Sequence, residues 1–323
     1  MKTVTIQLQK EADIVKHSFS LTLDDCQSDT KVIIENAYES NYANGWLNYK
    51  PYISKDGQTW QISEKAGSYD NKQFSFIIPA GFKMASWYQP YTITDFNNFA
   101  KSRGIENLIE TENNIPFIKI GDFNKPTILI MARQHPGETQ GSFMLEGIID
   151  ELVEIKSKLK KFSFLIIPLA NISGVENLNH RYSVEGVDFN RAWNSDNKDI
   201  QNLKQIISQI QNKAFCLDLH ADEASKKSYI YYGGCNFLPE SFYQSLFPKE
   251  FMFLKELSRL RRFAKNLIRH KRIVSLAKPD TAKNYFIKNG FDSFTIELVA
   301  HTQTPQECYK LGKKLIKNLK KQA

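Results

Sequence analysis

The strongest chemical signal in the sequence is a histidine and a glutamate three residues apart. His135 and Glu138 lie in a turn that contains proline and glycine, between the apolar segment Thr127–Ala132 and a long helical pattern. Such a turn can direct an imidazole and a carboxylate to one point, and catalytic zinc binds three nitrogen or oxygen ligands while one position stays open. The alternative is a plain helix start, where Glu138 only favours the positive end of the helix dipole.

A second histidine occupies the same kind of position. His220 follows the short apolar segment Phe215–Leu219. A single histidine at a strand end is more often structural than functional. Two strand ends with ligand-type side chains are a stronger signal, because the carboxyl ends of parallel strands face one crevice. The pattern therefore favours a metal site shared by the two strand ends.

Two further segments carry side chains suited to substrate binding and proton transfer. Asn190 and Arg191 are adjacent and can hold a carboxylate, and Arg181 lies ten residues before Arg191. Ordinary surface polarity of an exposed loop is the alternative. Glu297 stands inside the apolar segment Phe294–Val299, where a carboxylate without a partner is costly. Burial would raise its pKa toward the range of a general base, and the neighbouring sequence offers no lysine or arginine partner.

The elements that must position these residues fall into two regions. The first holds short alternating segments separated by turn signals such as Asn44-Gly45 and Asp56-Gly57, a pattern typical of antiparallel strands. The segments are Thr3–Gln9, Lys31–Glu35, Trp46–Ile53, Thr59–Ser63 and Gln73–Ile78. We predict a small antiparallel β-sandwich domain over residues 1–92.

From residue 93 to residue 323 the pattern changes to strands that alternate with helices. The predicted strands are Thr127–Ala132, Phe162–Ala170, Phe215–Leu219 and Phe294–Val299. The predicted helices are Thr139–Lys160, Asp199–Gln211, Phe251–His270 and the C-terminal segment. This alternation predicts an α/β domain with a mixed, mostly parallel sheet and helices on both faces.

Composition sets the broad class. The 323 residues are 41% hydrophobic and 24% charged, as in ordinary globular proteins. The longest apolar run, Phe162–Ala170, has the length of a strand, and the N-terminus has no apolar stretch of signal-peptide length. We therefore expect a cytoplasmic protein. The four cysteines form no C-x-x-C pair, which predicts free thiols. The net charge of +8 is spread out except at Lys313–Lys321, a segment that we interpret as a surface helix rather than a nucleic-acid arm.

The four signals in this order resemble the M14 zinc carboxypeptidases. That family has H-x-x-E, then a loop with an arginine and an Asn-Arg pair, then a histidine at a strand end, then a glutamate on a late strand. The resemblance covers Thr127 to Leu298. The motifs ARQHPGET and YSVEGVDFNRAW, the N-terminal β-domain and the junction WYQPYT are similar to the cytosolic carboxypeptidase subfamily.

The resemblance implies a zinc-dependent metallocarboxypeptidase that acts on a peptide or protein tail. Its metal, one zinc ion, would be held by His135, Glu138 and His220. Asp188 matches the aspartate that orients the first histidine ligand. Glu297 matches the catalytic glutamate, which takes a proton from water and delivers it to the leaving amine.

The resemblance also implies how the substrate is held. Arg181 matches the arginine that stabilises the oxyanion, and Asn190 with Arg191 matches the pair that binds the terminal carboxylate of the substrate. Arg133 matches an arginine beside the metal motif and is expected to contact substrate. Lys283 takes the place of an arginine that lines the pocket of the departing side chain, which predicts a preference for acidic C-terminal residues. The alternative for Lys283 is a solvated helix residue.

The sequence departs from the family at two points. The tyrosine that covers the substrate carboxylate has no clear counterpart, and Tyr285, the nearest candidate, is close to Glu297 in the sequence. His220 is followed by Ala-Asp, where the subfamily more often has Gly-His. The alternatives are a zinc amidohydrolase that deacylates N-acyl amino acids, as aspartoacylase-like members do, a cell-wall peptide peptidase, which the missing export signal disfavours, and a non-catalytic peptide-binding module. No nucleic-acid or membrane partner is expected.

Overall fold

Alternating apolar residues build two small sheets in the N-terminal lobe. The computed structural model describes residues 1–40, 43–155, 160–255 and 280–322. One sheet consists, in order, of β1 (Lys2–Ile6), β5 (Thr30–Ile34), β9 (Phe74–Ile78) and β8 (Ser68–Tyr69). The other consists of β4 (Ser20–Thr22), β10 (Met84–Ser86), β6 (Tyr52–Ser54) and β7 (Trp60–Ile62). Residues of both sheets share one apolar core around the fully buried Trp46.

Two details of this lobe differ from the sequence prediction. Strands β1 and β5 pair in parallel, whereas the other pairs of these two sheets are antiparallel. The segment predicted as one strand, Trp46–Ile53, begins as a 3-10 turn, η2 (Ala43–Trp46), and becomes a strand only at β6. Asn48 in the left-handed region, with φ of 59°, interrupts the extended backbone between them.

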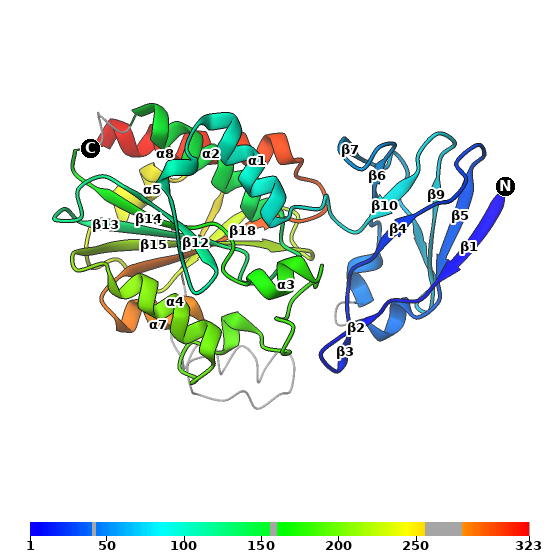
Figure 1. The fold of residues 1–323 in the computed structure, drawn as a ribbon, viewed down its shortest axis with the longest axis horizontal. Helices are drawn as coiled ribbons and strands as arrows, with labels where there is room; N and C mark the ends of the chain where they lie inside the picture. Colours follow the sequence, from blue (N-terminus) through cyan, green and yellow to red (C-terminus); the bar gives the residue numbers. More distant parts are fainter. Residues whose placement is uncertain (41–42, 156–159, 256–279, 323) are drawn as a thin grey trace.

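The second lobe is built on one eight-stranded sheet (Figure 1). Its order is β11 (Ile109–Glu112), β12 (Ile115–Ile120), β14 (Ser163–Ile167), β13 (Thr127–Ala132), β15 (Lys213–Asp222), β18 (Asp292–Val299), β16 (Tyr229–Tyr232) and β17 (Met252–Lys255). The central strands β14, β13, β15 and β18 run parallel, and β12 and β16 flank them antiparallel. The predicted mixed α/β sheet is confirmed.

Helices cover both faces of this sheet, with α1, α2 and α8 on one side and α4 and α7 on the other (Figure 1). On the first side lie α1 (Ile93–Arg103), α2 (Gln140–Ile155), α5 (Glu240–Leu246) and α8 (Pro305–Gln322). On the second lie α4 (Lys198–Ser208) and α7 (Ala282–Lys288), while the short α3 (Ile172–Glu176) faces the N-terminal lobe. Strand β13 is buried throughout because Ile128 and Ile130 enter one core and Leu129 and Met131 the other.

Helices α2 and α8 approach each other closely because glycines lie at their crossing. A Cβ on Gly147 would lie 2.0 Å from the carbonyl oxygen of Tyr309, and a Cβ on Gly312 would lie 2.1 Å from that of Met144. The crossing closes the core on this face of the sheet.

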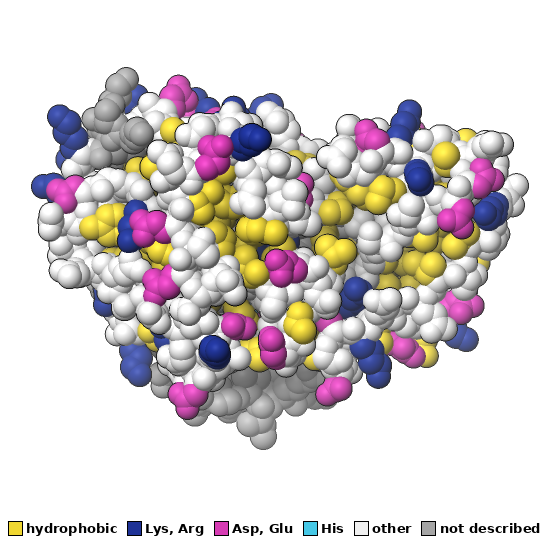
Figure 2. Space-filling view, viewed as in Figure 1, with side chains coloured by type: hydrophobic (Ala, Val, Ile, Leu, Met, Phe, Trp, Pro, Cys, Tyr) yellow, Lys and Arg dark blue, Asp and Glu magenta, His cyan; other side chains and the backbone are white. Residues whose placement is uncertain are grey.

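One helix prediction differs from the structure. Met252–Lys255 is strand β17, although the segment Phe251–His270 was predicted to be helical, and residues 256–270 lie outside the described part of the chain. No described helix is long and apolar enough to cross a bilayer. On the face shown in Figure 2, lysine and arginine side chains are scattered among acidic ones rather than gathered in one patch.

Candidate metal centre and active site

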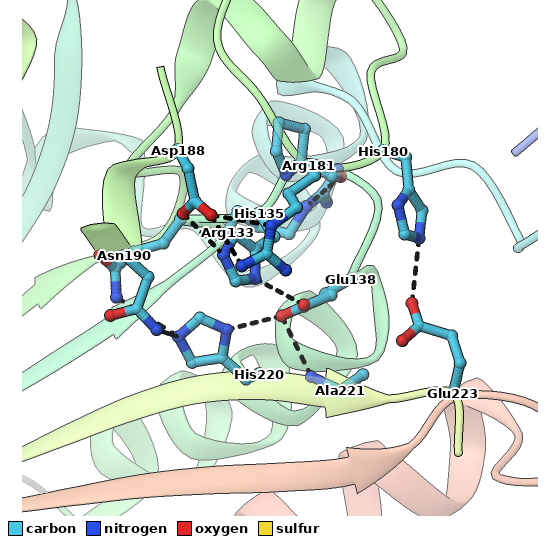
Figure 3. Close-up of polar contacts among 12 residues, drawn as sticks. Arg133, His135, Glu138, His180, Arg181, Asp188, Asn190, His220, Ala221 and Glu223 are labelled. Carbon is cyan, nitrogen blue, oxygen red and sulfur yellow. Dashed lines mark hydrogen bonds and ion pairs between the residues drawn. The ribbon is translucent and has the colours of Figure 1, made fainter. Parts of the chain in front are cut away.

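Three parallel strands bring the predicted site residues to one edge of the sheet. The turn of His135 and Glu138 follows β13 directly, and His220 lies near the carboxyl end of the neighbouring β15. Glu297 on β18 stands in register with His220. Residues far apart in the sequence therefore meet at the carboxyl ends of β13, β15 and β18, where α/β sheets form their sites. Figure 3 shows His135, Glu138 and His220 directed toward one another.

His135, Glu138 and His220 form a buried cluster whose ligand atoms converge. The Nδ1 atom of His135 lies 2.6 Å from Oε1 of Glu138, and Nδ1 of His220 lies 2.7 Å from Oε2 of Glu138. All three ligand atoms lie within 4.8 Å of one another, and the residues are only 5%, 8% and 1% exposed. Two imidazoles and one carboxylate are a known catalytic zinc set. Among the described residues this is the one such group, and its donor chemistry fits zinc.

Carboxylates behind the histidines set the ring orientation. Oδ1 of Asp188 lies 3.2 Å from Nε2 of His135, and Oδ2 of Asp218 lies 3.1 Å from Nε2 of His220. With a proton on each Nε2 directed to these carboxylates, each Nδ1 would keep its lone pair for a metal. Gln134 holds Asp218 in place by donating to both carboxylate oxygens at 2.8 Å.

The sequence analysis missed Asp218 and Gln134. A signal for Asp218 was present, because it stands two residues before His220 and therefore points from the same face of β15. Gln134 carried no such signal. Its carbonyl accepts from the Trp193 indole at 2.7 Å, a contact that joins segments 59 residues apart.

Arg181 pairs with the same aspartate that orients His135. Its Nε and Nη2 atoms lie 2.8 and 2.7 Å from Oδ2 of Asp188. Burial acts to raise the pKa of Asp188, but the contacts with His135 and Arg181 outweigh it and lower the pKa to about 2. The aspartate is therefore ionised and links the arginine to the metal ligand.

The adjacent Asn190 and Arg191 are placed differently. The amide nitrogen of Asn190 lies 3.3 Å from Nε2 of His220, and its carbonyl oxygen accepts from the backbone N–H of Ala282 at 3.0 Å. Arg191 is exposed, and its guanidinium donates to the carbonyl of Asn190 at 2.7 Å. Asn190 thus stands beside the metal cluster, while Arg191 lies at the surface next to it.

Glu297 is a partly buried residue of β18 that lies beside His220 in the sheet. Its backbone pairs with His220 on one side and Tyr229 on the other. Among the described residues nothing forms a hydrogen bond or ion pair with its carboxylate. Burial raises the pKa of Glu297 well above its usual range, and the charges of Glu138, Asp222 and Glu223 act in the same direction against His220.

The resemblance implied that Arg133 contacts substrate, but the side chain lies in the protein interior. It is only 2% exposed and has a left-handed φ of 63°. Its guanidinium donates to the carbonyls of Pro136 and Tyr91 at 2.8 and 3.0 Å and to Oγ of Ser142 at 2.9 Å. Because these donors point into the protein, Arg133 holds the turn of His135 and Glu138 against the start of α2. It does not reach toward a ligand.

Lys283 and Tyr285, both on α7, pack against different aromatic side chains. Lys283 is only 5% exposed, and its Nζ lies 4.1 Å from the ring centre of Tyr231. This burial rules out the alternative of a solvated helix residue. Tyr285 packs its ring 5.1 Å from that of Trp193 in the core below the sheet, and so does not stand over the metal cluster.

Comparison with known proteins agrees with this geometry. A family model described as zinc carboxypeptidase matches residues 110–321, and one described as cytosolic carboxypeptidase N-terminal domain matches residues 2–89. Cytosolic carboxypeptidase 1 of Gallus gallus is 34% identical over 126 residues, and that of Homo sapiens is 32% identical over 126 residues. Each alignment covers 35% of this chain, and the chain spans only 10% of the length of these relatives.

Solved structures share the fold over nearly the whole chain. A metallo-carboxypeptidase from Burkholderia cenocepacia superposes with a TM-score of 0.76 at 19% identity, over 94% of this chain and 88% of its own. A metallo-carboxypeptidase from Pseudomonas aeruginosa gives 0.73 at 18% identity, over 99% and 93%. At this identity the likeness shows the fold alone.

The mixed sheet with a two-histidine, one-glutamate cluster at its carboxyl edge is the architecture of a metallopeptidase-type hydrolase. Since the zinc carboxypeptidase model spans more than half of the chain, the chain belongs to the zinc carboxypeptidase family, peptidase M14. The match of residues 2–89 confirms the resemblance to the cytosolic carboxypeptidases.

Proposed function

We propose that this protein is a zinc metallocarboxypeptidase that hydrolyses the C-terminal peptide bond of peptides or protein tails. The observation that carries the proposal is the buried cluster of His135, Glu138 and His220 with Glu297 in register beside it. We infer that the cluster binds one zinc ion per chain. We also infer two units, residues 1–92 and 93–323, supported by separate sheets and by the capping box of Thr92 and Asp95 that starts α1.

Glu297 suits the role of the general base. When bound, zinc would polarise the scissile carbonyl and lower the pKa of a bound water. A base works best when its pKa lies near the operating pH, and burial moves the pKa of Glu297 upward from the acidic range. Glu297 would take the proton from water and then deliver it to the leaving amine, which restores the carboxylate.

The polar residues around the cluster suit the recognition of a chain end. Asn190 lies beside His220, and Arg191 lies next to it at the surface, so the pair can meet a carboxylate that enters from solvent. Arg181 would turn part of its guanidinium toward the oxyanion while Asp188 holds it in place. An internal peptide bond offers no adjacent free carboxylate, so these residues favour a terminal one.

We further propose a preference for acidic C-terminal residues, carried by Lys283. The preceding residue, Ala282, donates its N–H to Asn190, so the first turn of α7 adjoins the candidate carboxylate site. A buried ammonium at this position would attract a glutamate or aspartate side chain and repel a basic one. Lysine lacks the bidentate fork of arginine, so the selectivity is expected to be moderate.

The test of the activity uses matched peptides that differ only in the last residue, with and without a chelator. We expect release of that residue, loss of release with the chelator, and recovery on addition of zinc. N-acetyl amino acids are assayed in parallel. Cleavage of these instead of the peptides would favour the amidohydrolase, and tight peptide binding with no turnover would favour a non-catalytic module.

A cytoplasmic location is proposed from the likeness to cytosolic carboxypeptidases.

The test of the preference compares kcat/KM for peptides ending in Glu, Leu and Lys. We expect the order Glu above Leu above Lys in the wild type, and a reversed order of Glu and Lys in Lys283→Glu. Lys283→Met keeps the length of the buried stem and should level the three substrates. Lys288→Glu is the matched control, because Lys288 is an exposed lysine on the same helix. A wild type that prefers Leu or Lys would refute the preference.

A further inference from the structure

A hairpin of the N-terminal lobe contacts the loop that carries Arg181. The hairpin consists of β2 (Lys10–Glu11) and β3 (Ile14–Val15), and Figure 1 shows it on the side that faces the second lobe. Its turn touches the loop directly, because a Cβ on Gly186 would lie 2.9 Å from the Cβ of Ala12. The two lobes are therefore in contact at the edge of the candidate active site.

Glu11 provides the main polar contact of this hairpin. Its side chain is only 3% exposed. Oε2 accepts from the backbone N–H of His180 at 2.7 Å and from that of Arg181 at 3.0 Å, and Oε1 lies 3.1 Å from the Arg181 N–H. Hydrogen bonds to a carboxylate are stronger than those between neutral groups. One buried charge thus holds two successive amides of the Arg181 loop.

The loop that Glu11 holds is connected to the metal cluster by two routes. The carbonyl of His180 accepts from the N–H of Gly137 at 2.8 Å, inside the turn that carries His135. This approach is close, because a Cβ on Gly137 would lie 2.9 Å from the His180 carbonyl oxygen. The second route passes through Arg181, whose guanidinium pairs with Asp188, which in turn contacts His135.

The backbone position of Arg181 therefore depends on a residue of the other lobe. An arginine that must meet a developing oxyanion needs its Cα held closely, since small displacements weaken such contacts strongly. Tyr88 makes a second contact between the lobes, from its hydroxyl to the carbonyl of Asn179 at 3.3 Å. That contact reaches the loop but not the amides of His180 and Arg181.

We propose that Glu11 is a positioning residue for Arg181, so that the N-terminal β-domain completes the active site rather than only supporting the fold. This inference rests on the proposed carboxypeptidase function. Because Arg181 acts in the transition state, loss of Glu11 lowers kcat more than it raises KM.

The experiment measures steady-state kinetics, zinc content and amide hydrogen exchange for Glu11→Ala and Glu11→Gln in the full chain. We expect kcat to fall by about tenfold or more in Glu11→Ala, with KM within about twofold and zinc content unchanged. The amides of His180 and Arg181 should exchange faster in the same variant. Glu11→Gln keeps the shape of the side chain and one acceptor oxygen, so its kcat should lie between that of the wild type and that of Glu11→Ala. Tyr88→Phe is the matched control and should keep the wild-type kcat.

A double variant separates positioning from general destabilisation. Glu11→Ala should lower kcat little further in a protein that already carries Arg181→Ala, because Arg181, through which Glu11 acts, is gone. Full additivity of the two losses would overturn the proposal, and so would unchanged amide exchange in Glu11→Ala and Glu11→Gln. If the wild type hydrolyses no peptide, the proposed function fails, whereas the exchange measurement still decides whether Glu11 holds the loop.

Discussion

His301 makes stability depend on pH at the junction of the two lobes. It follows β18 and packs its ring 4.9 Å from Trp87 and 5.0 Å from Tyr49, both in the N-terminal part. Its Nε2 is buried and has no hydrogen-bond partner among the described residues. Burial lowers the pKa of His301 from 6.5 to about 4, with Glu223 opposing and His180 adding to the effect. Burial lowers the pKa of His17 in the same region as well.

The sign and size of the effect follow from linkage. Below pH 6.5 the unfolded chain binds a proton at this histidine and the folded chain does not, so acid favours unfolding. The lowering of the pKa from 6.5 to about 4 corresponds to a change of about 3 kcal/mol in the free energy of unfolding between high and low pH. This stability is fully present above pH 6.5, and about 2 kcal/mol of it is lost when the pH falls to 5.

The assay is urea unfolding at pH 8 and pH 5 for the wild type and His301→Phe. Phenylalanine keeps a ring against Trp87 and Tyr49 but does not titrate, so titrating groups that do not interact with His301 cancel in the comparison. The wild type should lose about 2 kcal/mol more than the variant between the two pH values. Equal losses in the two proteins would refute the assignment of a neutral, partly buried imidazole at this position.

Three further predictions concern the metal, the base and the helix crossing. His135→Ala and His220→Ala should purify with far less zinc than the wild type, measured by elemental analysis, and full occupancy in both would contradict the ligand assignment. Glu297→Gln should keep its zinc and its melting temperature but lose about 10²–10⁴-fold in kcat, and near-normal turnover would remove it as the base. Gly147→Ala should cost about 3 kcal/mol of unfolding free energy, because the new Cβ meets a carbonyl of α8 at 2.0 Å, whereas Gly234→Ala, with no atom within 4 Å, should cost far less.

Much of the catalytic lobe could be predicted from local patterns. The strand Thr127–Ala132 was predicted with its observed bounds, since a short apolar run between turn signals indicates a buried strand. Predictions failed where apolar residues do not follow a regular period. Trp46 was assigned to a strand as part of an alternating segment, although it anchors the core from a 3-10 turn. The short strands β4 and β10 were not among the predicted segments.

The sequence by itself determined which side chains could bind a metal, in what order they occur, and that they follow apolar strands. These are local properties, because residue type and periodicity act within a few positions. Only the tertiary structure decided what each side chain meets. Arg133 stands beside the metal motif in sequence, yet its guanidinium is hydrogen-bonded inside the protein. Glu11 and His180 are 169 residues apart and are joined only by the docking of one lobe on the other. Such contacts depend on how whole elements pack, and no local pattern records them.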